Sequence, residues 1–351
     1  MSNVDNCIVC SKVIKQCHKN ISCKKCKSYV HKKCTKLKPK QIKQLCQTEW
    51  VCSKCIDEDG CYDTTDSEFE PEDFYFSDDD LKKYDSMKFN PLRFESTVKN
   101  DDEFCNYHDC SYIFPAQFES ALPDEKKNLF TVLNVNIRSI SKNFEKLKEC
   151  LKTVNYDFTV IGLSETHLKD KPHDYYNLSG YRLEYVNRVS RSKGGVCMYV
   201  TNKVDYKVRT DLCNANSNYE SCFIEIQRTN AKNILVGVVY RSHTPIDNFA
   251  LDMTTLLHKI NTENKMIYIM GDFNIDLLKD DTDRPTHDYI DLIYSYSLIP
   301  TIYKPTRITE TSATIIDNIL TNCESTIKSS ILVTDISDHF PTALMSSLSL
   351  C

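Results

Sequence analysis

Residues 267–277 read IYIMGDFNIDL, an apolar run that passes directly into a turn carrying two polar side chains, Asp272 and Asn274. Short apolar runs bounded by turn residues are typical of buried strands. The run from Met266 to Met270 therefore predicts a strand, and we expect Asp272 and Asn274 at its carboxyl end.

The same part of the chain holds further apolar runs that predict strands: Leu129–Ile137, Phe158–Leu163, Gly195–Val200, Ser221–Ile226, Ile234–Tyr240 and Ser330–Val333. Apolar residues at helical spacing predict helices over 143–154, over 245–260, where Pro245 is placed to start the helix, and over 287–298. The stretch 343–350, ALMSSLSL, is strand-like and would close the fold. Many strands with few helices do not fit strict βαβ alternation and predict a two-sheet α/β sandwich.

Charge divides the 351 residues into three segments. Residues 1–56 have a formal balance of +11, residues 57–125 of −16, and the remainder is neutral, which together give the net charge of −5. Residues 57–125 contain acidic clusters without a steady apolar period, so they predict a disordered linker. We therefore expect a small domain over 1–56, a linker over 57–125 and a main domain over 126–351.

The N-terminal segment holds eight metal-ligand side chains in pairs, each pair separated by two residues: Cys7, Cys10, Cys23, Cys26, His31, Cys34, Cys52 and Cys55. This spacing lets both members of a pair reach one tetrahedral ion, so the set predicts two zinc sites. The order of the ligands, with Trp50 two residues before the last pair, resembles a plant-homeodomain (PHD) finger. That resemblance implies interleaved sites: Cys7, Cys10, His31 and Cys34 on one zinc, and Cys23, Cys26, Cys52 and Cys55 on the other.

Many PHD fingers bind histone tails, but the charge of this segment favours a different partner. With seven ligand thiolates and two zinc ions the finger would carry a net charge of about +8. Such a field repels a basic peptide and attracts phosphate backbones. We expect nucleic-acid contact through lysines such as Lys24, Lys25 and Lys27, with a merely solvated lysine surface as the alternative. RNA and chromatin stay open as partners beside DNA.

Five short motifs in the main domain place polar side chains next to predicted strands: Asn134 with Asn136, Glu165 with His167, Tyr240 with Arg241, Asp272 with Asn274, and Ser337-Asp338-His339. Hydrolysis of a phosphodiester needs such an inventory. A hard cation takes oxygen ligands, which Glu165 and Asp338 can supply. The attacking water needs a base, and the charge on phosphorus needs donors such as His, Asn and Tyr. Each motif alone is weak, whereas all five together indicate an enzyme.

Residues 129–349 resemble the exonuclease–endonuclease–phosphatase superfamily, and within it the endonuclease of non-long-terminal-repeat (LINE-type) retrotransposons. The strings that carry the resemblance are LNVNIRSI, IGLSETHL, RVSRSKGGVCMYV, VVYRS, IYIMGDFNIDL, KPTRITETSATIIDNILTN and ISDHFP. The resemblance implies a DNA endonuclease that uses Mg²⁺ or Mn²⁺ and leaves a 3′-hydroxyl.

The resemblance also implies roles for individual residues. Glu165 would ligate the metal, with Asn134 and Asp338 close to the ion or its waters. Asp272 and Asn274 would orient and activate the water. His339, held by Asp317, would contact the scissile phosphate, and Tyr240 would donate to a phosphate oxygen. Whether His339 or Asp272 takes the proton stays open, as does DNA contact by Arg188, Arg191 and Lys193.

Two alternatives compete with this interpretation. The first is another superfamily enzyme, such as an abasic-site repair endonuclease or a lipid phosphatase. Repair enzymes of this fold typically carry Trp near the site, whereas the only Trp of this chain is Trp50. The second is a PHD-type chromatin or nucleic-acid adaptor with an inactive nuclease-like domain.

No apolar run approaches the ~20 residues that span a bilayer, and the chain lacks a secretion signal. We therefore expect no membrane partner and a nuclear protein, with the cytoplasm as a second location.

Overall fold

The computed structural model describes residues 20–22, 29–31, 78–89, 108–122, 129–168, 174–188, 193–309, 311–323, 327–348 and 350. The chain divides into two compact units, Met1–Glu68 and Phe69–Cys351. In the first unit, strands β1 (Asn20–Ser22) and β2 (Tyr29–His31) pair antiparallel, with Asn20 opposite His31. The predicted zinc ligands Cys7, Cys10, Cys23, Cys26, Cys34, Cys52 and Cys55, and the side chain of His31, lie outside the described residues.

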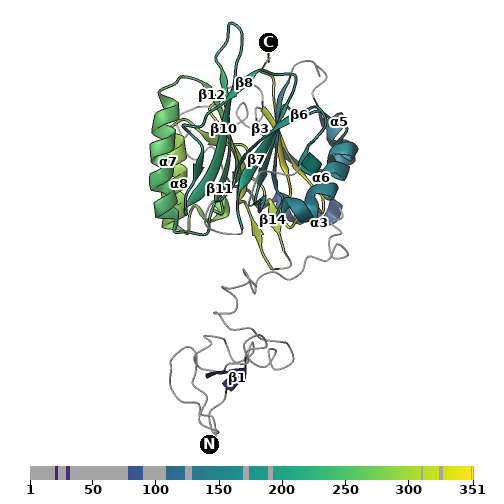
Figure 1. Ribbon diagram of the computed structural model, residues 1–351. Coiled ribbons are helices and arrows are strands. Elements are labelled where there is room, and N and C mark those ends of the chain that lie inside the picture. The colour runs from purple at the N-terminus through teal and green to yellow at the C-terminus, as the bar shows by residue number, and fades with distance from the viewer. Residues whose placement is uncertain are drawn as a thin grey trace, which may run out of the picture. The chain divides into compact units, whose positions relative to one another are not determined.

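The second unit contains one sheet built around the strand of residues 266–272 (Figure 1). Its order is β13-β16-β12-β11-β10-β8, with β9 paired to β10. The strands are β8 (Tyr206–Val208), β9 (Asn214–Ala215), β10 (Tyr219–Ile226), β11 (Ile234–Arg241), β12 (Met266–Asp272), β13 (Ile299–Pro300) and β16 (Asp317–Thr321). β11 and β12 are parallel, and the other pairs are antiparallel.

The other sheet of this unit has the order β3-β17-β18-β4-β5-β7-β6. Its strands are β3 (His108–Ile113), β4 (Phe130–Asn136), β5 (Val160–Ser164), β6 (Tyr181–Val186), β7 (Val196–Thr201), β17 (Ile327–Leu332) and β18 (Thr342–Ser346). Strand β18, from the stretch expected to close the fold, pairs with β17 on one side and β4 on the other. A separate hairpin is formed by β14 (Arg307–Ile308) and β15 (Ala313–Thr314).

Helices cover the outer faces of the two sheets (Figure 1). Helices α7 (Ile246–Asn261) and α8 (Arg284–Ser295) lie on one side, and α6 (Ile140–Val154) lies on the other. Shorter elements are α3 (Asp78–Asp85), α5 (Phe118–Ala121), η3 (Pro115–Gln117), η4 (Asp174–Tyr176) and η5 (Leu277–Lys279). None of the helices in the described part of the chain is long and apolar enough to cross a membrane.

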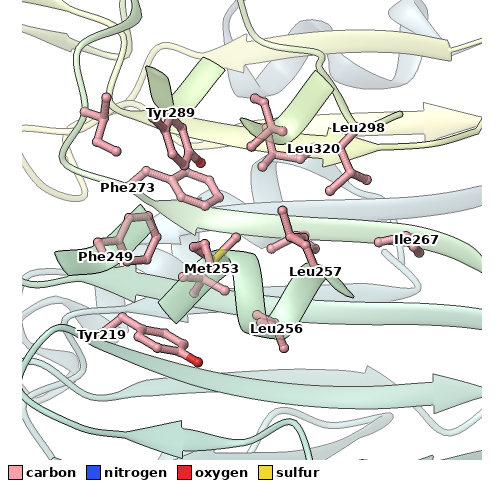
Figure 2. Packing of buried hydrophobic residues seen from close by; sticks show 14 of the residues in the cluster. Tyr219, Phe249, Met253, Leu256, Leu257, Ile267, Phe273, Tyr289, Leu298 and Leu320 are labelled. Carbon is pink, nitrogen blue, oxygen red and sulfur yellow. The ribbon is translucent and has the colours of Figure 1, made fainter. Parts of the chain in front are cut away.

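Apolar side chains explain this layering. Between the sheets, β4 contributes Phe130 and Val132 to a buried cluster with Tyr268 and Met270 of β12. The Phe130 and Tyr268 rings lie 4.6 Å apart. A second cluster joins α7 and α8 to the outer face of the first sheet, as Figure 2 shows for Phe249, Met253, Leu257, Tyr289, Leu298 and Leu320. Since each fully buried side chain of this size contributes roughly 1.5–3 kcal/mol, these clusters stabilise the packing of the layers.

The predicted elements of residues 129–333 are confirmed, with shifted ends. The third helix begins at Arg284 and not near His287, because the Asp283 carboxylate caps it by accepting from the Thr286 N–H at 3.1 Å. It ends at Ser295 and not at 298, because Ser297 has a positive φ of 56° and turns the chain back. The two-sheet α/β sandwich follows as expected.

The predicted linker is the part of the domain plan that the structure changes. Strand β3, from inside 57–125, pairs parallel with β17 at the edge of a sheet, His108 opposite Ile327. Cys110 of β3 and Leu81 of α3 are buried in a cluster with Ile331 and Phe340. Acidic residues surround these few apolar positions in the sequence, so composition alone hides the strand. The structured unit therefore begins before residue 126.

This boundary gives a first prediction. A chain that begins at Leu129 should be less stable than one that begins at Phe69, because it lacks β3 and the buried Phe118 and Leu122. At roughly 1.5–3 kcal/mol for each large apolar side chain removed from the core, the loss is several kcal/mol. Urea unfolding of the two chains measures it. Equal midpoints and slopes would mean that residues 69–128 do not belong to the folded unit.

Candidate active site

Four strands bring their polar motifs to one place. β4 ends at Asn136 and runs parallel to β5, whose last residue, Ser164, precedes Glu165. In the other sheet, β12 ends at Asp272, directly opposite Asp317 at the start of the antiparallel strand β16. The ends of both sheets therefore meet, and the polar residues that follow each apolar run collect there.

Asn136 links the two sheets. Its Nδ2 donates to Glu165 Oε1 at 2.9 Å and to Asp272 Oδ2 at 2.9 Å. Asn134, the amide singled out from the sequence, is also buried, but its Nδ2 lies 3.3 Å from Thr342 Oγ1 and 3.5 Å from the Gly271 carbonyl. The two amides are two residues apart and share one face of β4. The sequence motif contains both amides, but the resemblance assigns the role near the metal to Asn134, whereas Asn136 is the amide that contacts the two carboxylates.

Glu165 is held as a carboxylate in a strained turn. Its φ is +53°, which is unusual for a residue other than glycine. Burial alone would raise the pKa of this carboxyl group, but the neighbouring His167, the hydrogen bond from Asn136 and the charge of His339 hold its pKa at about 2. The His167 Nε2 lies 3.4 Å from Glu165 Oε2, which supports a positioning role for His167. Glu165 is therefore ionised at neutral pH.

Asp272 is fully buried and surrounded by amides. Besides the bond from Asn136, it accepts from the Asn274 backbone N–H at 2.9 Å and from Asn274 Nδ2 at 3.3 Å. Asn274 has φ +48° and also donates to the Arg241 carbonyl at 2.8 Å, which fixes the turn. Burial and the neighbouring Asp317 carboxylate raise the pKa of Asp272 well above its usual range. This carboxylate therefore takes up a proton more readily than an exposed one.

Asp317 and His339 form a buried ion pair, with His339 Nδ1 2.8 Å from Asp317 Oδ2. Thr306 Oγ1 donates to the same Oδ2 at 2.8 Å. Burial opposes protonation of the imidazole, but the Asp317 carboxylate outweighs burial and raises the pKa of His339 to about 9. His339 therefore carries a positive charge at neutral pH.

Tyr240 completes the group from the end of β11. Burial, with the negative charges of Glu165 and Asp272, raises the pKa of its hydroxyl, which stays protonated and can donate. The guanidinium of Arg188 lies 5.7 Å from the Tyr240 ring centroid. Arg188 also pairs with buried Glu220. The absence of a side chain at Gly194 leaves room for the guanidinium, since a Cβ added there would lie 2.8 Å from it. Arg188 is thus a buried partner of Glu220, while Arg191 lies outside the described residues.

Asp338 occupies a different environment from the other carboxylates. Its Oδ1 lies 2.8 Å from Arg138 Nη1, and its Oδ2 lies 2.8 Å from both Nε and Nη2 of Arg307. These cations lower the pKa of Asp338 against the effect of its burial. Arginines therefore lie against both oxygens of this predicted metal ligand, but among the described residues only its Oδ2 accepts a hydrogen bond, from Arg307.

The remaining carboxylates fit a divalent cation. Ligand atoms of Asp272, Asp317 and His339 lie within 4.8 Å of one another. Asp317 Oδ1 is buried and has no hydrogen-bond partner among the described residues. Close carboxylates with an unsatisfied oxygen lose repulsion when a cation binds, and oxygen donors suit Mg²⁺ or Mn²⁺.

Comparisons with known proteins identify the family of this chain. Residues 133–339 match the model of the Endonuclease/Exonuclease/phosphatase family. A comparison with curated protein sequences gave no match. An AP endonuclease from Leishmania major is similar in structure, with 12% identity over 73% of this chain and 98% of that one and a TM-score of 0.53. The 3′-5′ exonuclease of Neisseria meningitidis has 13% identity, coverage of 62% and 100%, and a TM-score of 0.47.

Proposed function

The chain belongs to the endonuclease/exonuclease/phosphatase family, and on that premise we propose that it is a metal-dependent DNA endonuclease of the LINE retrotransposon type. The observation that carries the proposal is the Asn136 bridge between Glu165 and Asp272, together with the buried Asp317–His339 ion pair in the same cluster. An ionised carboxylate, a basic carboxylate and a cationic imidazole in one group supply what phosphodiester hydrolysis requires.

Glu165 is the residue we assign to Mg²⁺ or Mn²⁺, because its carboxylate is ionised and partly accessible and Asn136 links it to Asp272. A bound divalent ion supplies electrostatic stabilisation of the negative charge that develops on the phosphate oxygens. The second ligand that the family resemblance implies, Asp338, lies 2.8 Å from the guanidinium groups of two arginines.

We assign separate proton-donating and proton-accepting roles to His339 and Asp272. His339 holds its proton at neutral pH, so it donates to a phosphate oxygen and does not act as the base. Asp272, whose Oδ2 accepts from Asn136 Nδ2 at 2.9 Å and from Asn274 Nδ2 at 3.3 Å, is the group that we assign to accept the proton of the attacking water. Asn274, bonded to Asp272, orients that water, and the protonated Tyr240 hydroxyl donates to the phosphate.

Cleavage of supercoiled plasmid by the full-length chain tests this function, and polymerase extension of the nick shows whether a 3′-hydroxyl is left. The second candidate function is repair cleavage at abasic sites, which the similarity to the Leishmania enzyme favours. A duplex with one abasic site is the substrate that distinguishes this function from the proposed one. Cleavage confined to the abasic duplex would replace the proposed function. Absence of cleavage on both substrates would leave the adaptor alternative.

Replacement of Asp317 by asparagine should change the pH dependence of cleavage more than the DNA affinity. The Asp317 charge raises the pKa of His339, so wild-type turnover should fall as the pH rises through about 9, where the imidazole loses its proton. In Asp317→Asn the fall should begin at lower pH, and the loss at pH 7 should be smaller than in His339→Ala. The measurement is turnover from pH 6 to 10, with Asp288→Asn on the surface of α8 as control. An unshifted alkaline limb would remove Asp317 from its assigned role.

The N-terminal segment completes the proposal as a zinc finger that binds DNA, RNA or chromatin in the nucleus. Its support is the spacing of eight ligands and the +11 balance of residues 1–56. We predict two zinc ions per full-length chain by metal analysis. Cys23→Ser should lower that number, and Cys17→Ser, outside the ligand pattern, should not. One zinc ion or none in the wild-type chain would contradict the eight-ligand assignment.

A further inference from the structure

Two arginines and Asp338 form a cluster, which we call the arginine clamp, beside the proposed catalytic group. The carboxylate is the covered member, with 12% of its side chain exposed, whereas Arg138 is 32% and Arg307 36% exposed. Both guanidinium groups therefore reach the solvent to a greater extent than the Asp338 carboxylate with which they pair.

Each member of the clamp is connected to the proposed catalytic group by a hydrogen bond or by adjacency in the sequence. The Arg138 backbone N–H donates to Asn136 Oδ1 at 3.1 Å, and Asn136 bridges Glu165 and Asp272. Arg307 follows Thr306, which donates to Asp317. Asp338 directly precedes His339. The clamp therefore lies next to the same site.

The backbone around Arg138 supports a functional placement. Arg138 and Ser139 have φ values of +48° and +133°, in the region that residues other than glycine rarely adopt. Such strain costs of order 1–3 kcal/mol and collects at functional sites. The turn between β4 and α6 thus holds the Arg138 side chain toward Asp338 at an energetic cost.

Arg307 binds its anchor through one edge only. Its Nε and Nη2 both lie 2.8 Å from Asp338 Oδ2. Among the described residues no bond uses its Nη1, so that part of the guanidinium keeps two hydrogens for another acceptor. A divalent cation bound directly to Asp338 would instead meet two guanidinium groups of like charge. The environment thus favours an anion and opposes a metal ion.

We propose that the arginine clamp binds a backbone phosphate of the DNA next to the cleaved bond, and that Asp338 anchors the arginines instead of ligating the metal. The inference rests on the proposed function, since it assumes a DNA substrate. Arginine is suited to the role because its planar guanidinium can donate to a carboxylate and a phosphate at once. Asp338 is then a positioning residue.

Binding of the full-length chain to duplex DNA in EDTA, across a series of salt concentrations, tests the phosphate contact without cleavage. Arg138→Gln and Arg307→Gln should each weaken binding and lower the slope of log affinity against log salt by about one. The matched control is Arg228→Gln, in the turn between β10 and β11, at the end of those strands opposite Tyr240. A wild-type slope in both clamp variants overturns the phosphate contact.

Manganese binding, followed by the electron paramagnetic resonance of free Mn²⁺, tests the anchor. Glu165→Gln should lose one site, whereas Asp338→Asn should keep wild-type Mn²⁺ affinity within about twofold. Asp338→Asn should change DNA affinity in the wild-type background and leave it unchanged in the Arg138→Gln/Arg307→Gln background. Loss of the Mn²⁺ site in Asp338→Asn would overturn the anchor assignment.

If wild-type protein binds and cleaves DNA while these results fail, only the clamp is wrong. Absence of DNA binding by wild type would contradict the proposed function itself.

Discussion

Replacement of His339 by alanine is expected to reduce DNA cleavage by about two to four orders of magnitude, the range of a general acid or a preorganised donor to the transition state. DNA affinity should change much less. The imidazole is buried, paired with Asp317 at 2.8 Å and charged at neutral pH, so it donates where negative charge develops on the phosphate.

Single-turnover cleavage and EDTA binding of the same variant separate the two effects. His258→Ala, at an exposed position of α7, is the matched control and should cleave like wild type. Circular dichroism should show both variants folded. If His339→Ala cleaves as fast as wild type, His339 has no place in the chemistry.

Replacement of Gly271 by alanine should destabilise the fold strongly for a single substitution. Gly271 has φ +154° and precedes Asp272 on β12, beside the parallel strand β11. A Cβ here would lie 1.7 Å from the Val239 carbonyl oxygen, in backbone that cannot rotate away. Steric overpacking costs about 1–3 kcal/mol or more, and the unfavourable φ adds roughly 1–2 kcal/mol.

Thermal unfolding measures this loss, and Gly180→Ala isolates its cause. Gly180 also has a positive φ, +84°, but a Cβ there would meet nothing within 4 Å. Gly180→Ala should therefore show only the backbone cost, and Gly271→Ala a Tm roughly 5–15 °C lower than wild type. Cleavage should fall in Gly271→Ala because Asp272 is displaced. Equal Tm values for the two variants would contradict the tight approach of β11 and β12.

The sequence predicted best where a buried strand has a continuous apolar run. Met266–Met270 and Ile234–Tyr240 are such runs, and both strands form with ends shifted by one or two residues. Strand β3 was missed because its sequence HDCSYI is polar at most positions and stands among acidic residues. It forms a strand because it pairs with β17 at the edge of the sheet. This pairing is a tertiary contact, which local composition does not predict.

The site shows the same division. Strand-end motifs predicted which segments meet, since parallel strands bring their carboxyl ends to one edge. They did not distinguish Asn134 from Asn136, because that choice depends on which amide faces Asp272 across the sheets. The environment of Asp338 was also hidden, since Arg138 and Arg307 come from a turn and a hairpin distant from it in sequence.

Metal-dependent nicking of supercoiled plasmid by the full-length chain, compared with an Asp272→Asn variant in the same preparation, tests the central claim most directly. We expect wild-type protein to convert the plasmid to the open circle with Mg²⁺ or Mn²⁺ and to leave it intact in EDTA. Asp272→Asn should be slower by at least about a hundredfold in either metal, because the base is lost. Wild-type protein that fails to nick with either metal, or an Asp272→Asn variant that nicks at the wild-type rate, would contradict the assignment of this site as a nuclease centre.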